Sequence, residues 1–563
     1  MQTVIQTLVD PLIFWGVFLS VLTFSFLPGY AISIYIKKIN EIERLAVSFS
    51  LSFSLAVGLS LLLALYPPIV LQVLFLFILL VSIILVFHHF VVQRRAFTPI
   101  LIIFLGIFLI QLTVKVVSQI GWEYPIQGGD WFAHTFEVPL RFANGDWTPH
   151  QGRPPFFNLL ILFYHSILGT TLYDLWVSQI IITIANSVFL MPAFLIARKF
   201  FRNKVAIASV IFMSVNTFLF YQSIYPWPKN LSAYFCLMMI YFLLINERNL
   251  TFFWALAGFF AALGYLAHPM ALFYIVPCII VLAFQRGLFK PDLYVYVICL
   301  VVFVLPYFFW MYVHHGIITS FESYYPFVVE YDYKELYQMT HNEIMKRFWE
   351  APLWKIIYIR IYNFVSTITE LFAKHPVWYF MDNLPSVLTF PVFILSFIGV
   401  TMNYRKKASG VILLNIISLS FIFIVLFFGW RLPGIIGTGG QHPSVMILII
   451  IAFYALFEIK DSLIRRIGVV GIFSYALLQL VARPYYIIKW FNEGERHGVI
   501  NTIGRTWHYV EGFDFSKFIS AHYFLNTKFE ILFSLFVVVL FMSINIIMIF
   551  WSDRNVFSKI YKL

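Results

Sequence analysis

Apolar runs separated by short polar segments follow one another along the whole chain. Most runs are roughly 17 to 25 residues long, the length that a helix needs to cross about 30 Å of hydrocarbon. Runs such as VLFLFILLVSIILVF show no period-two alternation, which argues against β-barrel strands. The pattern therefore predicts an all-α polytopic membrane protein with about fifteen transmembrane helices. The expected spans lie near residues 11–35, 44–66, 69–91, 98–117, 174–197, 205–222, 230–246, 250–267, 270–285, 291–313, 383–403, 409–429, 443–459, 467–483 and 529–551.

One apolar run, residues 156–170, is shorter than the others. Its sequence FFNLLILFYHSILG has about 14 residues, too few for a full crossing, so we interpret it as a re-entrant or juxtamembrane helix. With the N-terminus outside, this interpretation puts the basic short loops and the C-terminus in the cytoplasm, as the positive-inside bias requires. These loops contain Lys37, Lys38 and Arg44, then Arg94 and Arg95, ARKFFRNK, RKK at 405–407 and KDSLIRR.

The composition agrees with a membrane protein and bears on which partners to expect. Only 11% of the residues are charged, and the mean hydropathy is +0.86. The formal net charge of +12 would suggest nucleic acid in a soluble protein. Here the basic residues lie in short loops, so no nucleic-acid partner is expected. The first apolar run is too long for the core of a signal peptide, so we expect a retained helix.

The three cysteines lie in apolar runs. Cys236, Cys278 and Cys299 show no CxxC spacing and no histidine nearby in the sequence. This pattern indicates neither a disulfide framework nor a thiolate metal site.

The polar and aromatic-rich loops all fall on the outer face in this topology, so we expect an extracytoplasmic active site. We divide the chain into four parts, of which the first is extra to the core. They are the N-terminal transmembrane helices 1–97, a transmembrane core 98–313 with the first outer loop 118–173, an outer loop 314–382 with amphipathic helices, and C-terminal helices 383–563 with outer loops 430–442 and 484–528.

The first outer loop contains the stretch GGDWFAHTFEVPLRFANGDWTPHQGRPP at residues 128–155. Asp130 follows two glycines, which let the backbone approach a ligand closely. A carboxylate held between two membrane segments is costly and suits a general base that takes a proton from an incoming hydroxyl. The alternative is that Asp130 caps a helix beginning at Trp131. Asp146, in NGDWTP, fits a turn better.

Other polar residues of this stretch are candidates for the same site. His134 lies four residues after Asp130 and therefore on the same face of such a helix, where it would orient the acid, bind phosphate or form a surface pair. Arg153 suits a phosphate clamp, or else it extends to lipid headgroups. We assign further residues to the substrate cavity, namely Glu137, Asp146, His150 and Trp131.

This loop resembles the first outer loop of GT-C glycosyltransferases, most closely the family-39 type, which includes protein O-mannosyltransferases and the aminoarabinose transferase that modifies lipid A. The resemblance covers about residues 98–290 in order and spacing. It rests on Asp130, Gly145-Asp146-Trp147, Pro149 and Pro154-Pro155 before an apolar helix. Two positions differ, because the family usually has Asp-Glu at Asp130-Trp131 and a lysine at Arg153.

The resemblance implies a GT-C-like fold and a donor in which a polyprenyl monophosphate carries the sugar. It implies that Asp130 matches the catalytic acid position that deprotonates the acceptor, and it supports a juxtamembrane helix at 156–170. In these relatives a basic residue of a late outer loop holds the donor phosphate. Arg431, in RLPGIIGTGGQHP, is the corresponding candidate.

Further outer-face residues are candidates for the substrate cavity. Lys229, in YPWPKN, begins a helix and would meet a lipid-linked phosphate, or else it anchors the interface together with Trp227. His268 separates two apolar runs and is either a cavity residue or a structural one. Glycines precede His442 at the start of another helix, where the backbone would wrap an oxyanion or form a plain hairpin. Lys115, within a span, lies close enough to the outer end to extend into water.

The absence of certain motifs from the sequence argues against two other classes of protein. It has no DxD pair and no Rossmann pattern, which argues against a soluble nucleotide-sugar transferase, and no inverted repeat, which argues against an ion-coupled transporter. We expect an inverting single displacement from a polyprenyl-phosphate sugar to a lipid, glycan or protein acceptor. A metal is not required and not excluded, since Arg431 with Lys229 or Arg153 would neutralise the phosphate. The alternatives are a lipid-linked glycan polymerase or ligase, and a non-enzymatic lipid or polysaccharide flippase.

Overall fold

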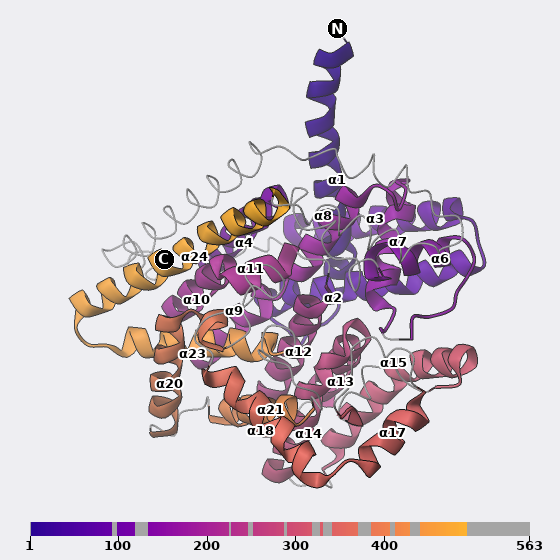
Figure 1. The fold of residues 1–563 in the computed structure, drawn as a ribbon. Coiled ribbons are helices and arrows are strands. Elements are labelled where there is room, and N and C mark those ends of the chain that lie inside the picture. Colours follow the sequence, from indigo (N-terminus) through magenta and orange to yellow (C-terminus); the bar gives the residue numbers. More distant parts are fainter. Residues whose placement is uncertain are drawn as a thin grey trace.

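The described part of the chain consists of helices and their connections (Figure 1). A computed structural model describes residues 2–92, 98–118, 133–151, 153–224, 227–245, 251–286, 290–317, 327–329, 340–369, 384–405, 411–427 and 440–492. No strand occurs among these residues. The all-α fold class is confirmed.

The helices follow the apolar runs of the sequence closely. Among the described residues, seven helices are long and apolar enough to cross a membrane, or eight if the bent pair α10 and α11 is one span, and six apolar helices are shorter. The protein is an integral membrane protein; the count of about fifteen crossings stays a prediction. The main helices are α1 (Gln2–Ser33), α2 (Glu41–Ser60), α3 (Pro68–Phe87), α4 (Pro99–Ser118), α6 (Val138–Ala143), α7 (Phe156–Leu168), α8 (Leu175–Ser187), α9 (Leu190–Phe200), α10 (Asn203–Val215), α11 (Thr217–Ile224), α12 (Lys229–Leu244), α13 (Thr251–Ala267), α14 (Leu272–Arg286), α15 (Pro291–His315), α17 (His341–Glu350), α18 (Leu353–Thr369), α19 (Leu384–Leu388), α20 (Phe390–Arg405), α21 (Val411–Phe427), α23 (His442–Glu458) and α24 (Ser462–Asn492).

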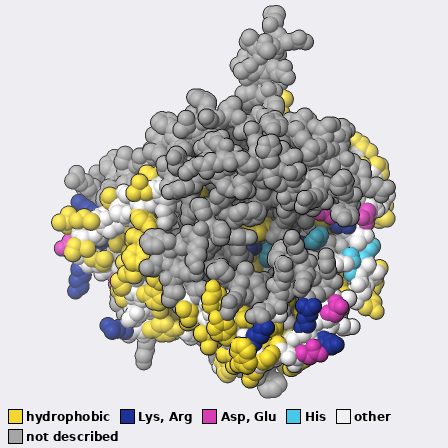
Figure 2. All heavy atoms as spheres, in the orientation of Figure 1, with side chains coloured by type: hydrophobic (Ala, Val, Ile, Leu, Met, Phe, Trp, Pro, Cys, Tyr) yellow, Lys and Arg dark blue, Asp and Glu magenta, His cyan; other side chains and the backbone are white. Residues whose placement is uncertain are grey.

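Large apolar side chains cover much of the described surface (Figure 2). On α3, for example, Leu76, Phe77 and Ile84 are exposed, whereas only a few of its residues are buried. On α18, Leu353 and Trp354 are exposed, whereas Arg360 is buried. A helix that turns apolar groups outward and polar groups inward suits contact with lipid rather than with water.

Two ends of the helical bundle are defined by long-range contacts. At one, which we call the Glu43 end, the Tyr241 hydroxyl near the end of α12 donates to Glu43 Oε1 at 2.7 Å, and Lys38 lies over the Phe252 ring. At the other, the Trp147 end, the Trp310 indole of α15 donates to the Trp147 carbonyl oxygen at 2.9 Å. Loops assigned to the cytoplasm by their charges therefore contribute to the first end, and loops assigned to the outside contribute to the second.

Helix α7 is short and has both ends in the half of the bundle near the Trp147 end. Its first residue, Phe156, packs edge-on against Phe235 in the second turn of α12, with ring centroids 5.6 Å apart. Near its last turn, the Ser166 carbonyl oxygen accepts a hydrogen bond from Gln72 Nε2, in the second turn of α3, at 2.7 Å. These contacts agree with a helix that does not cross the membrane.

The first three helices pack directly against the rest of the bundle. Ser25 of α1 shares a 2.6 Å hydrogen bond with the Tyr164 hydroxyl of α7, and Ser50 of α2 bonds to Tyr234 of α12. α1 and α2 approach so closely that a Cβ atom on Gly29 would lie 1.8 Å from the Ser48 carbonyl oxygen. Buried polar links thus join α1 to α7 and α2 to α12, while the division of the chain into four parts stays a prediction.

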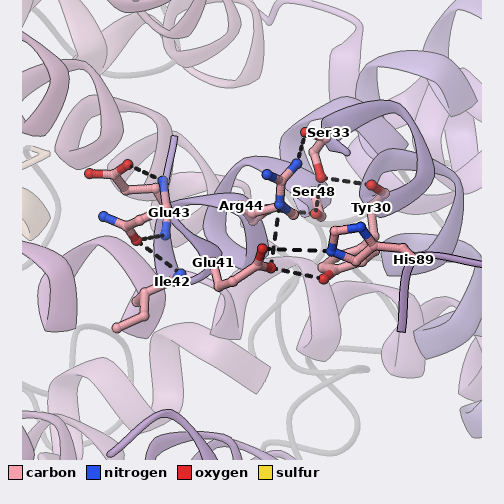
Figure 3. Close-up of polar contacts among 9 residues, drawn as sticks. Tyr30, Ser33, Glu41, Ile42, Glu43, Arg44, Ser48 and His89 are labelled. Atoms are coloured by element: carbon pink, nitrogen blue, oxygen red, sulfur yellow. Dashed lines mark hydrogen bonds and ion pairs between the residues drawn. The ribbon is translucent and has the colours of Figure 1, made fainter. Parts of the chain in front are cut away.

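A polar cluster closes the Glu43 end between α1, α2 and the single-turn π-helix η2 (His88–Val92) (Figure 3). Glu41 accepts a hydrogen bond from the Tyr30 hydroxyl at 3.1 Å and pairs with Arg44 Nε at 3.4 Å and His89 Nε2 at 3.6 Å. Arg44 also donates to the Ser33 carbonyl oxygen. Charged groups that are removed from water need partners. The Glu41 carboxylate has three, and its contacts link α1, α2 and η2.

Candidate functional site

Several of the predicted site residues gather around the first turn of α12, on the side of the Trp147 end. Lys229 is the first residue of α12 and is buried, although lysine is rarely so. Its Nζ lies 3.8 Å from the centroid of the Trp227 ring, a cation–π contact. Trp227 is also buried, and its carbonyl oxygen accepts a hydrogen bond from Asn186 Nδ2 at 2.7 Å. The lysine is therefore held inside the protein rather than at its surface.

Arg153 and His268 face each other beside this turn. Arg153 Nη1 lies 3.4 Å from His268 Nε2, and both side chains are buried. His268 Nδ1 accepts a hydrogen bond from the Met270 amide at 3.1 Å, so in the neutral imidazole Nε2 carries the proton. Guanidinium nitrogens only donate. The guanidinium and the imidazole thus lie side by side inside the protein, and both side chains are able to donate to an oxygen of a ligand.

Ser232 joins the Arg153–His268 pair to Lys229. It lies one turn after Lys229, and its hydroxyl contacts the carbonyl oxygens of Gly264 at 2.9 Å and His268 at 3.4 Å. These bonds fix the corner between α13 and the short helix η5 (Pro269–Ala271) against α12. Arg153, Lys229 and His268 therefore belong to one cluster.

The N-terminus of α23 packs against the same corner. Gly440 has a φ of +89°, and a Cβ atom there would lie 2.6 Å from Met270 Cβ, so both the conformation and the contact require glycine. The Tyr274 hydroxyl contacts the Gly440 carbonyl oxygen at 3.2 Å and Ser444 Oγ at 3.0 Å. These contacts bring the buried His442 close enough to Lys229 for the two to interact electrostatically.

Glu137 and Asp146 share a partner of their own, Arg141, whereas the backbone of His150 adjoins Arg153. Arg141 connects the two acids, with Nε 4.0 Å from Glu137 and Nη1 3.6 Å from Asp146. Desolvation raises the pKa of the Glu137 carboxyl, and the charge of Arg141 opposes this only in part. The His150 carbonyl oxygen accepts a hydrogen bond from the Arg153 amide at 3.4 Å.

Asp146 has the contacts of a turn residue. Its Oδ1 accepts a hydrogen bond from the Thr148 amide at 3.0 Å, the pattern of an Asx turn. Desolvation raises the pKa of its carboxyl, but the hydrogen bonds of Thr148 and the charge of Arg141 outweigh this, so the pKa lies below its ordinary value. These contacts agree with the turn interpretation of NGDWTP.

We expect Asp146→Asn to keep catalytic activity within about threefold of wild type, because an asparagine oxygen preserves the turn and an exposed ion pair contributes about 1 kcal/mol or less. Since the folded-state pKa is lowered, the ion pair stabilises the protein above the ordinary carboxyl pKa, and this stability is lost as the pH falls through the lowered pKa. Melting temperatures of both proteins, measured across acidic pH, should converge at the low end. A gap that widened there would contradict this role.

Four predicted residues remain unplaced. Asp130, Trp131 and Arg431 lie outside the described residues. The backbone of His134 belongs to the π-helix η3 (Ala133–Glu137), and its side chain lies outside the described part. Among the described residues, no three His, Cys, Asp or Glu side chains are grouped so that they could hold a metal ion.

The expectation for Lys115 was wrong, because its side chain does not extend into water. It is fully buried, donates to Ser223 Oγ at 2.9 Å and lies over the Phe189 ring at 5.3 Å. Neighbouring helices enclose the last turn of α4, which the sequence of α4 alone does not reveal. Sequence reasoning also missed an aromatic contact that holds the Gly-Asp-Trp turn. The Trp147 ring stacks on the Phe142 ring, with the ring centroids 5.0 Å apart.

Comparison with known proteins decides the class of enzyme. Residues 152–310 match the family model described as dolichyl-phosphate-mannose-protein mannosyltransferase. This match indicates an enzyme of the GT-C glycosyltransferase class. The resemblance expected from the first outer loop is thereby confirmed. The matched part of the glycosyltransferase includes Arg153, Lys229 and His268, whereas Asp130 precedes it and His442 follows it.

Two further comparisons concern the whole glycosyltransferase. Its structure is similar to the crystal structure of ArnT from Cupriavidus metallidurans bound to undecaprenyl phosphate, with 13% sequence identity and a TM-score of 0.45. The similarity covers 80% of this chain and 78% of that one. No curated protein matches the sequence.

Proposed function

We propose that this glycosyltransferase moves a sugar from a polyprenyl-phosphate carrier to a hydroxyl group of a lipid, glycan or protein acceptor. The observation that carries the proposal is the grouping of a buried arginine and a buried histidine beside a buried lysine. Arg153 Nη1 and His268 Nε2 lie 3.4 Å apart, and Lys229 begins the adjoining helix. In the donor, the phosphate is a diester of the polyprenol and the sugar, and it offers two non-bridging oxygens and one negative charge to such a group.

The cluster suits the leaving group of the reaction. As the acceptor oxygen attacks the anomeric carbon, the bond from that carbon to the phosphate oxygen breaks and negative charge grows on the phosphate. Buried donors already aimed at this position stabilise the charge without reorganising. Arg431 is the further candidate for the same phosphate, on the basis of sequence and family resemblance.

Asp130 is the proposed general base. It would take the proton of the attacking hydroxyl, with His134 orienting its carboxylate and Trp131 and Trp227 lining the sugar cavity. One carboxylate with a phosphate leaving group implies a single displacement, in which the anomeric configuration inverts. A divalent metal is not needed for this charge balance.

We further propose that the reaction takes place on the extracytoplasmic side. The cluster lies toward the Trp147 end of the bundle, whereas the basic residues Lys38 and Arg44 lie at the Glu43 end. Basic short loops face the cytoplasm in most membrane proteins. The N-terminus would then be outside and the C-terminus inside.

The test is transfer by purified protein in lipid nanodiscs, supplied with undecaprenyl phosphate linked to mannose, glucose, galactose or arabinose. We expect one donor to release undecaprenyl phosphate in step with glycosylated product, whose anomeric configuration by NMR is opposite to that of the donor. Retention of configuration would contradict the single displacement. Turnover only of diphosphate-linked oligosaccharides would instead indicate a glycan ligase and contradict the proposed donor.

A further inference from the structure

Two buried polar side chains at the start of α23 lack hydrogen bonds. Among the residues that the structure describes, none bonds to either amide atom of Gln441 or to either ring nitrogen of His442. Both side chains are 0% exposed. Gln441 occupies the N-cap position of α23, yet its side chain makes no capping bond. Since buried polar groups in folded proteins are normally paired, these four atoms are available to pair with groups of a ligand.

The backbone that carries the two side chains is fixed by specific contacts. The Tyr274 hydroxyl bonds to the Gly440 carbonyl oxygen at 3.2 Å, just before Gln441, and accepts from the Ser444 amide at 3.3 Å, just after His442. On one face the His442 ring packs against Phe218, with centroids 4.9 Å apart. Gln441 and His442 are therefore presented by a rigid corner of the fold.

The groups around Gln441 and His442 indicate what kind of ligand would bind to them. Lys229 is close enough to interact with His442, which disfavours a cation. An amide is uncharged and supplies two donors and an acceptor, whereas a neutral imidazole supplies one of each. Sugar hydroxyls also donate and accept, so adjacent hydroxyls of a sugar ring would satisfy both side chains. An apolar ligand would leave all four atoms unpaired.

We propose that Gln441 and His442 bind hydroxyl groups of the sugar that this enzyme transfers, and thereby determine which sugar it accepts. The inference rests on the proposed function, in which the Arg153–His268 pair holds the phosphate to which this sugar is attached. Met270 links the two places, because its amide bonds to His268 and its side chain contacts Gly440. The sugar would then extend from the phosphate toward the start of α23.

The test uses the full-length protein in nanodiscs, the undecaprenyl-phosphate sugar that wild type turns over fastest, and analogues of this donor that each lack one ring hydroxyl. Gln441→Met removes the amide at similar volume. For at least one deoxy donor we expect the kcat/KM of wild type to fall about 10- to 100-fold. Gln441→Met should be similarly impaired with the parent donor, yet should distinguish that deoxy donor from the parent by less than about twofold.

A second variant and a matched control complete the experiment. His442→Phe removes the other pair of unpartnered atoms, the imidazole nitrogens. If Gln441→Met does not fold, His442→Phe is compared with wild type in the same way. Asn403→Leu removes another buried amide whose Oδ1 lacks a partner among the described residues, on α20. This control should distinguish the donors as wild type does.

Three results would overturn the inference. If both site variants distinguish the deoxy donors as wild type does, the buried atoms bind ordered water only. If instead the KM for the acceptor alone changes, they bind the acceptor and not the transferred sugar. Absence of turnover by wild type with every donor would remove the proposed function and the inference together, and this result is seen before any variant is compared.

Discussion

Asp130→Asn is expected to abolish sugar transfer while leaving the protein folded and the donor bound. An amide is nearly the same size as a carboxylate but does not accept the proton of the attacking hydroxyl. Loss of a general base typically lowers the rate by about 10²- to 10⁴-fold. The effect should therefore appear in kcat, with little change in donor affinity. Transfer by purified protein in nanodiscs, at saturating donor, measures it.

The chain contains a matched control for this experiment. Asp130 and Asp146 both stand in Gly-Asp-Trp triplets of the same loop, and Asp146→Asn makes the same chemical change. Because Asp146 has the contacts of a turn residue, its variant should stay within about threefold of wild type. Equal loss in both variants would assign the effect to the loop rather than to a base. Full activity of Asp130→Asn would leave this residue as a helix cap.

Lys229→Met is expected to lower kcat/KM about 10²- to 10³-fold, the size of effect seen when a donor to a developing negative charge is removed. The loss should appear both in donor binding and in kcat, because the phosphate is charged in the donor and gains charge as it leaves. Methionine keeps the packing on Trp227, 3.8 Å from the lysine nitrogen, so the fold should persist. Steady-state kinetics with varied donor would separate the two contributions.

A second buried lysine serves as the control for charge removal. Lys115 is as deeply buried as Lys229, but its ammonium group donates to Ser223 Oγ and lies over the Phe189 ring. Lys115→Met should keep kcat/KM within about threefold. If Lys229→Met were no worse than Lys115→Met, the phosphate would have to be held by other residues.

The sequence determined the helices, and it predicts the side of the membrane on which the loops lie. The length of an apolar run fixes whether a helix spans the bilayer, and α7, with 13 residues, keeps both ends in one half of the bundle for that reason. Turn chemistry is equally local, so NGDWTP identified the turn at Asp146 correctly. The motif around Asp146 also indicated the GT-C class before any geometry was known.

Only the tertiary structure decided which polar residues meet. The pairing of Arg153 with His268, separated by 115 positions, depends on how α7 packs against α12 and α13, and no local pattern encodes it. The burial of Lys115 likewise comes from neighbouring helices rather than from α4 itself. Gln441 was not a candidate from sequence, since a glutamine before a helix is unremarkable until its amide is found buried and unpaired. Periodicity and capping act over one or two turns, whereas burial and pairing are properties of the whole packed bundle.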